Sequence, residues 1–61
     1  MEQNRTNNYK FIEHEAVMYE GSIARIEDRA MWHDGRNIYL IQTPNHMFKY
    51  VFEENLERYI G

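Results

Sequence analysis

The sequence predicts a single all-β domain, a small and partly open barrel of about five antiparallel strands. The chain has only 61 residues, which suffices for one small domain. Short β-branched and aromatic segments recur along it, and turn signals rich in Gly, Pro, Asn and Asp separate them. Both sides of the predicted central strands carry apolar residues, which favours a curved sheet covered on both faces.

The N-terminal residues differ in composition from the rest of the chain. Residues 1–8 are polar and offer nothing to bury, so we expect a disordered arm there and a single domain over 9–61. Apolar content begins at Tyr9, and the turn signal Glu20-Gly21 ends this first apolar segment.

The segment 22–32 fits two structures. Its apolar residues match strand alternation as well as helical spacing, and Ser22 could cap a helix. Gly21 before it and Asp34-Gly35 after it are typical of hairpin turns. We therefore predict a strand over 22–28 that continues irregularly to residue 33, and the alternative is an α+β fold with a helix at 22–32.

Two further strands are predicted over 38–41 and 48–52. The turn between them lies at 43–46, where Pro44 fixes φ. One face of the second strand carries three aromatics, Phe48, Tyr50 and Phe52. We expect this aromatic row to belong to the core, because so small a domain can hardly leave three aromatics outside it.

Four short sequence patterns follow one another along the chain in the same order as in a known fold. An apolar strand ends in a Gly turn at 16–21, and an Ile-Ala-Arg-Ile strand follows at 23–26. A Tyr-x-Ile strand comes at 39–41, and the closing segment 50–56 reads aromatic-Val-x-Glu-x-x-Leu. This order resembles small SH3-like barrels, including those of bacterial and prophage accessory proteins, over about residues 11–60.

The resemblance implies an SH3-like barrel with one 3₁₀ turn near Glu54, after which Leu56 packs into the core. The peptide-binding signature of eukaryotic SH3 domains is not matched here. Their ligand is therefore not implied, since a fold does not by itself give a function.

Charge and composition weigh against several functions. Seven basic and ten acidic residues give a net charge of −3, which argues against nonspecific nucleic-acid binding. No apolar run approaches the roughly 18 residues of a membrane span, and no signal-peptide pattern occurs, so we expect a cytoplasmic protein without a membrane partner. There are no cysteines and the three histidines lie far apart, so we expect no metal site and no cofactor.

Catalysis is not expected either. Several carboxylate pairs occur, but acid–base chemistry needs a cleft of a few hundred Å³, and a domain of this size has little room for one. The sequence also lacks a Gly-rich phosphate loop and a nucleophile elbow.

The segment 31–36 is the strongest candidate for a binding site. Trp and Arg are among the residue types most enriched at binding hot spots, and a Trp beside a hairpin tip is hard to bury. The candidate partner-binding residues are Met31, Trp32, His33 and Arg36. The competing interpretation is that Trp32 folds back and caps one end of the barrel.

We therefore expect a non-catalytic protein-binding module, an accessory or inhibitory factor that acts on a host or partner protein. Small acidic proteins of this kind are common in phages and mobile elements. The alternative is single-stranded nucleic-acid binding through a basic aromatic face, with the candidate residues Arg25, Arg29, Lys49 and Tyr50. An open sheet edge near the termini would also allow a homodimer.

Overall fold

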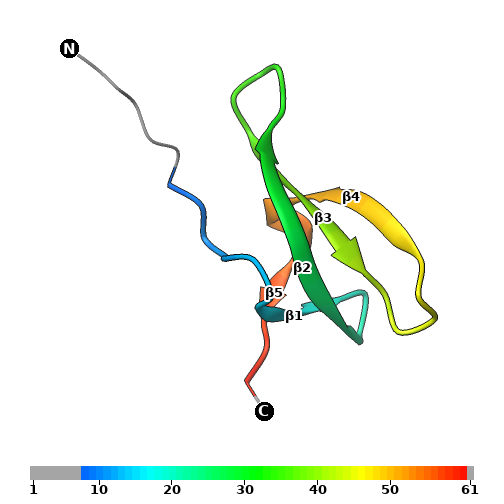
Figure 1. Ribbon diagram of the computed structural model, residues 1–61. Coiled ribbons are helices and arrows are strands. Elements are labelled where there is room, and N and C mark those ends of the chain that lie inside the picture. The colour runs from blue at the N-terminus through cyan, green and yellow to red at the C-terminus, as the bar shows by residue number, and fades with distance from the viewer. Residues whose placement is uncertain (1–7, 61) are drawn as a thin grey trace.

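The computed structural model describes residues 8–60, which form an all-β fold (Figure 1). The strands are β1 (Ala16–Tyr19), β2 (Ser22–Met31), β3 (Asn37–Gln42), β4 (Phe48–Phe52) and β5 (Glu57–Arg58), and one 3₁₀ helix, η1 (Glu53–Asn55), connects the last two. They form one open five-stranded antiparallel sheet in the order β4-β3-β2-β1-β5. The predicted fold class is confirmed. The predicted arm lies outside the described residues except for Asn8.

The turns form where the sequence predicts them. Glu20-Gly21 is a two-residue hairpin turn with φ of 50° and 81°, the left-handed pair that matches the twist of the flanking strands. The loops 32–36 and 43–47 share one hydrogen-bond pattern, in which the fourth residue donates its N–H to the carbonyl of the first. The backbone of that fourth residue has a positive φ in both loops, 94° at Gly35 and 65° at His46.

Strand β2 settles the ambiguous segment. It is ten residues long and pairs with β1 along its first half and with β3 along its second half. The register shifts between Ile26 and Asp28, so a bulge at Glu27 interrupts the strand where it passes from one neighbour to the other. The strand prediction is confirmed, with its irregularity, and the helix alternative at 22–32 is wrong.

The core lies on the concave side of the sheet. It contains Phe11, Val17, Ala24, Ile26, Tyr39, Ile41, Val51 and Leu56. Leu56 is 3% exposed and follows η1, as the resemblance implied. Phe11 comes from the segment before β1, and its ring meets that of Tyr39 edge-on at 5.6 Å between centroids.

The expectation that the aromatic row of β4 belongs to the core is wrong. Val51 is its buried residue, whereas Phe48 and Tyr50 are 57% and 61% exposed. Val51 lies directly opposite Tyr39, and its small side chain fits beside that ring. Because side chains alternate along a strand, the aromatic row must then point away from the core.

A polar network holds the segment before β1 against the sheet. The buried hydroxyl of Tyr39 accepts the backbone N–H groups of Lys10 and Phe11, at 3.0 and 3.2 Å, and donates to the Glu53 carboxylate. The same Glu53 oxygen accepts from the Lys10 N–H at 2.9 Å and from the Asn37 amide at 3.2 Å. The network therefore connects the N-terminal segment, β3 and η1.

Burial and this network shift two pKa values. Burial, together with the hydrogen bond to Glu53, raises the pKa of Tyr39 to about 12. Burial would raise the pKa of Glu53 as well. The hydrogen bonds from Tyr39, Lys10 and Asn37 outweigh that effect and hold the pKa of Glu53 below its ordinary value of 4.5.

Replacing Glu53 by Gln is expected to lower the free energy of unfolding at neutral pH by about 1–3 kcal/mol, because an amide oxygen replaces a carboxylate that accepts several hydrogen bonds. The lowered pKa means that ionised Glu53 favours the folded state. This contribution is complete above the unfolded-state pKa near 4.5 and is lost as the pH falls through the folded-state value.

Urea unfolding at several pH values measures both effects. The stability of the native protein should fall more steeply below pH ~5 than that of Glu53→Gln. Glu54→Gln is the control, since Glu54 is an exposed carboxylate of the same turn. Equal acid sensitivity of the native protein and Glu53→Gln would contradict the role assigned to Glu53.

Candidate functional site

The convex side of β2, β3 and β4 carries an apolar surface of its own. Tyr39 and Ile41 of β3 face the core, so the residues that alternate with them face outward. The register sets these outward residues directly opposite the aromatic row of β4. We call the resulting surface the outer aromatic face, defined as Trp32, Ile38, Leu40, Phe48, Tyr50 and Phe52.

At the hairpin end, the outer aromatic face is well packed. The rings of Trp32 and Phe52 meet edge-on, with centroids 5.8 Å apart and an interplanar angle of 83°. Ile38 lies opposite Phe52 and is only 8% exposed, although it is not part of the core cluster. Its cover therefore comes from the outer side of the sheet.

Trp32 does not cap the barrel. It is 40% exposed and lies on the outer side of the sheet, because it alternates with Met31 on the core side. Its ring instead contacts Phe52 and His33, the latter at 5.0 Å between centroids. The capping interpretation is wrong, and one large part of the indole remains accessible to solvent.

Arg36 forms a charged rim beside this cluster. Its guanidinium lies 3.9 Å from the centroid of the Phe52 ring, which is a close cation–π contact. Its Nε also donates to Asp34 Oδ2 at 2.8 Å. The Arg36 backbone N–H, its side chain and its charge hold the pKa of Asp34 below the ordinary value, so Asp34 stays ionised beside Arg36.

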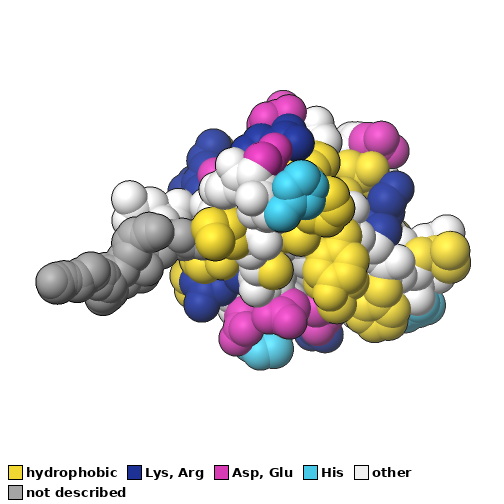
Figure 2. All heavy atoms as spheres, turned by 90° about the horizontal axis from the view of Figure 1, so that it is seen from above, with side chains coloured by type: hydrophobic (Ala, Val, Ile, Leu, Met, Phe, Trp, Pro, Cys, Tyr) yellow, Lys and Arg dark blue, Asp and Glu magenta, His cyan; other side chains and the backbone are white. Residues whose placement is uncertain are grey.

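At the other end, the outer aromatic face is more open. Phe48 and Tyr50, both on β4, are more than half exposed there. Seen from above, hydrophobic side chains form a continuous band next to a histidine (Figure 2). Contiguous exposed apolar surface of this kind commonly marks an interaction site.

The structure brings together three of the four predicted partner-binding residues. Trp32 and His33 are in ring contact, and Arg36 reaches the same cluster through Phe52. Met31 precedes Trp32 and pairs with Asn37, so it lies on the opposite side of β2, where it is 52% exposed.

The candidate nucleic-acid residues are dispersed. Of the three cations, only Arg25 shares the side of Tyr50, and it is held in an ion pair with Glu27 at 2.8 Å. Arg29 stacks on a tyrosine ring of the N-terminal segment at 4.9 Å. Lys49 lies over a ring of β1, on the concave side. These cations form no continuous track along the outer aromatic face.

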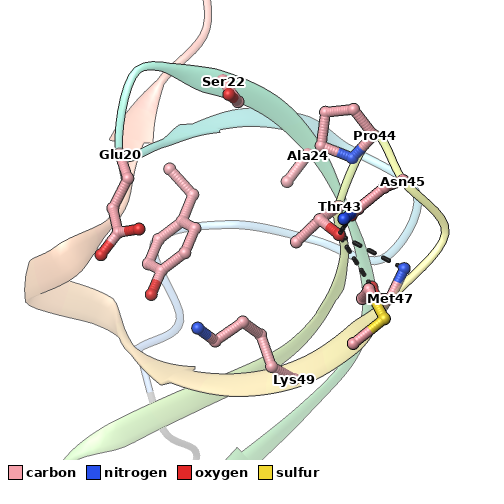
Figure 3. A pocket seen from close by; sticks show the side chains of 9 residues that line it. Glu20, Ser22, Ala24, Thr43, Pro44, Asn45, Met47 and Lys49 are labelled. Carbon is pink, nitrogen blue, oxygen red and sulfur yellow. Dashed lines mark hydrogen bonds between the residues drawn. The ribbon is translucent and has the colours of Figure 1, made fainter.

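A cavity of about 430 Å³ opens between the β1–β2 turn and the β3–β4 loop (Figure 3), so the expectation that the domain has little room for a cleft of this size is wrong. Lys49 reaches into it, with Ser22 and Thr43 among the lining residues. Hydrogen bonding to Tyr19, together with the nearby charge of Glu20, raises the pKa of Lys49 above its ordinary value. Glu20 lines the same cavity and offsets the charge of Lys49, and the Thr43 hydroxyl already donates to Asn45 Oδ1 at 2.6 Å.

Comparison with known proteins gives no match. No protein-family model matches the sequence, and no curated protein or solved structure matches it at a significant level. Within residues 8–60, no cluster of three or more His, Cys, Asp or Glu side chains is placed to hold a metal ion. Over the same range, no helix is long and apolar enough to cross a bilayer.

Sequence reasoning missed Ile38, Leu40 and Phe52 as parts of the surface. The available signal was that the strand 38–41 is apolar on both sides, so one of its faces had to be covered from outside the core. The contact between Trp32 and Phe52 joins residues 20 positions apart, and no local pattern predicts it.

The exposed position of the aromatic row can be tested by mutation. We expect Phe48→Ser to change the free energy of unfolding by less than about 1 kcal/mol, as for other exposed sites. Val51→Ala, on the buried face of the same strand, should cost about 1–3 kcal/mol. Urea unfolding measures both, and a loss for Phe48→Ser as large as that of a buried Phe (~3–5 kcal/mol) would show that the row is in the core.

Proposed function

We propose that this chain is an SH3-like barrel that acts as a non-catalytic protein-binding module through the outer aromatic face. The observation that carries the proposal is the exposure of three large aromatics on one side of a 61-residue protein. Trp32 is 40%, Phe48 57% and Tyr50 61% exposed. A domain this short gains little stability from such residues unless a partner covers them.

The topology supports the SH3-like assignment. The five antiparallel strands and the 3₁₀ helix between β4 and β5 agree with what the sequence resemblance implied. On the same resemblance, we propose an accessory or inhibitory role toward a host or partner protein, with an origin in a phage or mobile element. The expected cytoplasmic location belongs to this proposal.

The composition of the surface favours a protein partner. The cores of protein interfaces are enriched in Trp, Tyr, Phe, Met and Arg and depleted in Lys, Glu and Asp. The outer aromatic face contains three of these enriched types, Trp, Tyr and Phe, with Arg36 at its hairpin end. The paired charges of Arg36 and Asp34 form the polar rim that such interfaces usually have.

Single-stranded nucleic-acid binding is the second candidate. Exposed aromatics on one face provide the stacking surface that such binding uses. The dispersed cations and the net charge of −3 weaken this candidate, because phosphate contacts supply much of the affinity.

Capture experiments with a matched pair of variants test the proposal. Trp32 and Tyr59 are both 40% exposed, but Tyr59 follows β5 at the opposite edge of the sheet. Once a captured protein is identified, Trp32→Ala should weaken its affinity by about 30-fold or more, the effect of losing a hot-spot residue. Tyr59→Ala should leave the affinity unchanged, and circular dichroism should show that both variants fold.

Equal binding by Trp32→Ala and the native protein would contradict the proposed surface. Titration of a single-stranded oligonucleotide at rising salt tests the second candidate. Affinity that falls steeply with salt would favour nucleic acid over a protein partner.

A further inference from the structure

The two edges of the sheet are protected to very different degrees. The β5 edge has only two residues, Glu57 and Arg58, both charged and exposed. The β4 edge has five residues, of which three are aromatic and one is charged. Short edge strands and edge charges are the usual protection against pairing with another strand. β4 has little of either, and no strand within residues 8–60 covers its free side.

The backbone groups that β4 leaves unpaired can be identified. The N–H of Thr43 donates to the carbonyl of Met47 at 2.8 Å, so this pair is a hydrogen-bonded one. Hydrogen-bonded pairs alternate along an antiparallel ladder, and the next ones on β4 are Lys49 and Val51. The N–H and C=O groups that point to the free edge therefore belong to Phe48, Tyr50 and Phe52.

We propose that β4 pairs antiparallel with β4 of a second copy of this chain, around a two-fold axis at Tyr50. In this register Tyr50 lies opposite its own counterpart, and Phe48 lies opposite Phe52 of the other copy. Each outward N–H and C=O of these three residues then finds a partner. A shift by one residue would set outward groups against groups already bonded to β3.

The side chains fit a second copy as well. The axis sets aromatic residues opposite aromatic residues on the convex side, and such cross-strand pairs stabilise a sheet. Lys49 lies in the first half of β4, whereas Glu53 and Glu54 follow its end. Antiparallel pairing brings the Lys49 half of one strand toward the acidic end of the other, whereas parallel pairing would align like charges.

A closed dimer is the expected product. Pairing of β4 with β5 of another copy would be head-to-tail and would not close as a dimer, and β5 offers only two charged residues. The two-fold arrangement sets the outer aromatic faces of both copies side by side on one continuous sheet and leaves Trp32 accessible. The inference concerns self-association and goes beyond the proposed partner binding.

Charge substitutions at the axis test the proposal, because a residue on a two-fold axis meets its own copy. Tyr50→Lys and Tyr50→Glu each place like charges opposite each other, which should weaken dimerisation by about 100-fold or more. An equimolar mixture of the two variants should dimerise again. Tyr59→Lys adds the same charge to another exposed tyrosine and should remain dimeric.

Sedimentation equilibrium of the full chain, at concentrations up to on the order of 100 µM, measures the assembly state. The proposal is supported by a native dimer, monomeric single variants and a restored mixed dimer. A monomeric native chain, dimers of either single variant or a monomeric mixture would each overturn it. A monomer would also be the result if the chain's own N-terminal segment covers the β4 edge.

A further variant tests the pairing independently, in case the charged variants do not fold. Since the Tyr50 N–H points to the free edge, Tyr50→Pro keeps the β3–β4 hydrogen bonds and removes a donor at the axis. It should fold, as judged by circular dichroism, and should dimerise more weakly than the native chain. Unchanged dimerisation of folded Tyr50→Pro would overturn the proposed pairing.

Discussion

The buried hydroxyl of Tyr39 is the interaction on which the rest of the structure depends. It receives two backbone N–H groups of the N-terminal segment and donates to Glu53 at the start of η1. This 61-residue chain has no cysteine to fix its ends, so the segment before β1 must be held by contacts of this kind. Without them, the buried N–H of Phe11 would have no partner, and Phe11 would lose the anchor that sets its ring in the core.

The residues that fill the core determine which face of β4 is exposed. Phe11 and Tyr39 fill the concave side with two large rings, in edge-to-face contact. Val51 lies opposite Tyr39 and is 6% exposed, so it is the β4 residue that completes this part of the core. Because Val51 faces inward, the aromatic row on the other side of β4 must face outward. The outer aromatic face is thus a consequence of the N-terminal segment completing the core.

The strands, turns and η1 could be predicted because their signals are local. Gly21, Gly35 and Pro44 mark the turns, and β-branched or aromatic residues fill the segments between them. Alternation also separates the two faces of β4, but it does not say which one is buried. That choice depends on Phe11, which meets Tyr39 from 28 positions away. The cluster at Trp32 was predicted in part for the same reason: Trp32, His33 and Arg36 are neighbours in sequence, whereas Phe52 joins them only through the fold.

The sheet is therefore apolar on both sides, and its convex layer is well packed at the hairpin end as well as exposed. Ile38 is buried beneath this layer, Phe52 lies against Trp32, and Arg36 stacks on Phe52 from the rim. Side chains held in this way have already lost most of their rotamer freedom, so a partner would not have to supply that ordering cost. Aromatics also present a large contact area with few rotatable bonds. Under the proposed function, an aromatic surface on a curved sheet would provide this contact area without a deep pocket.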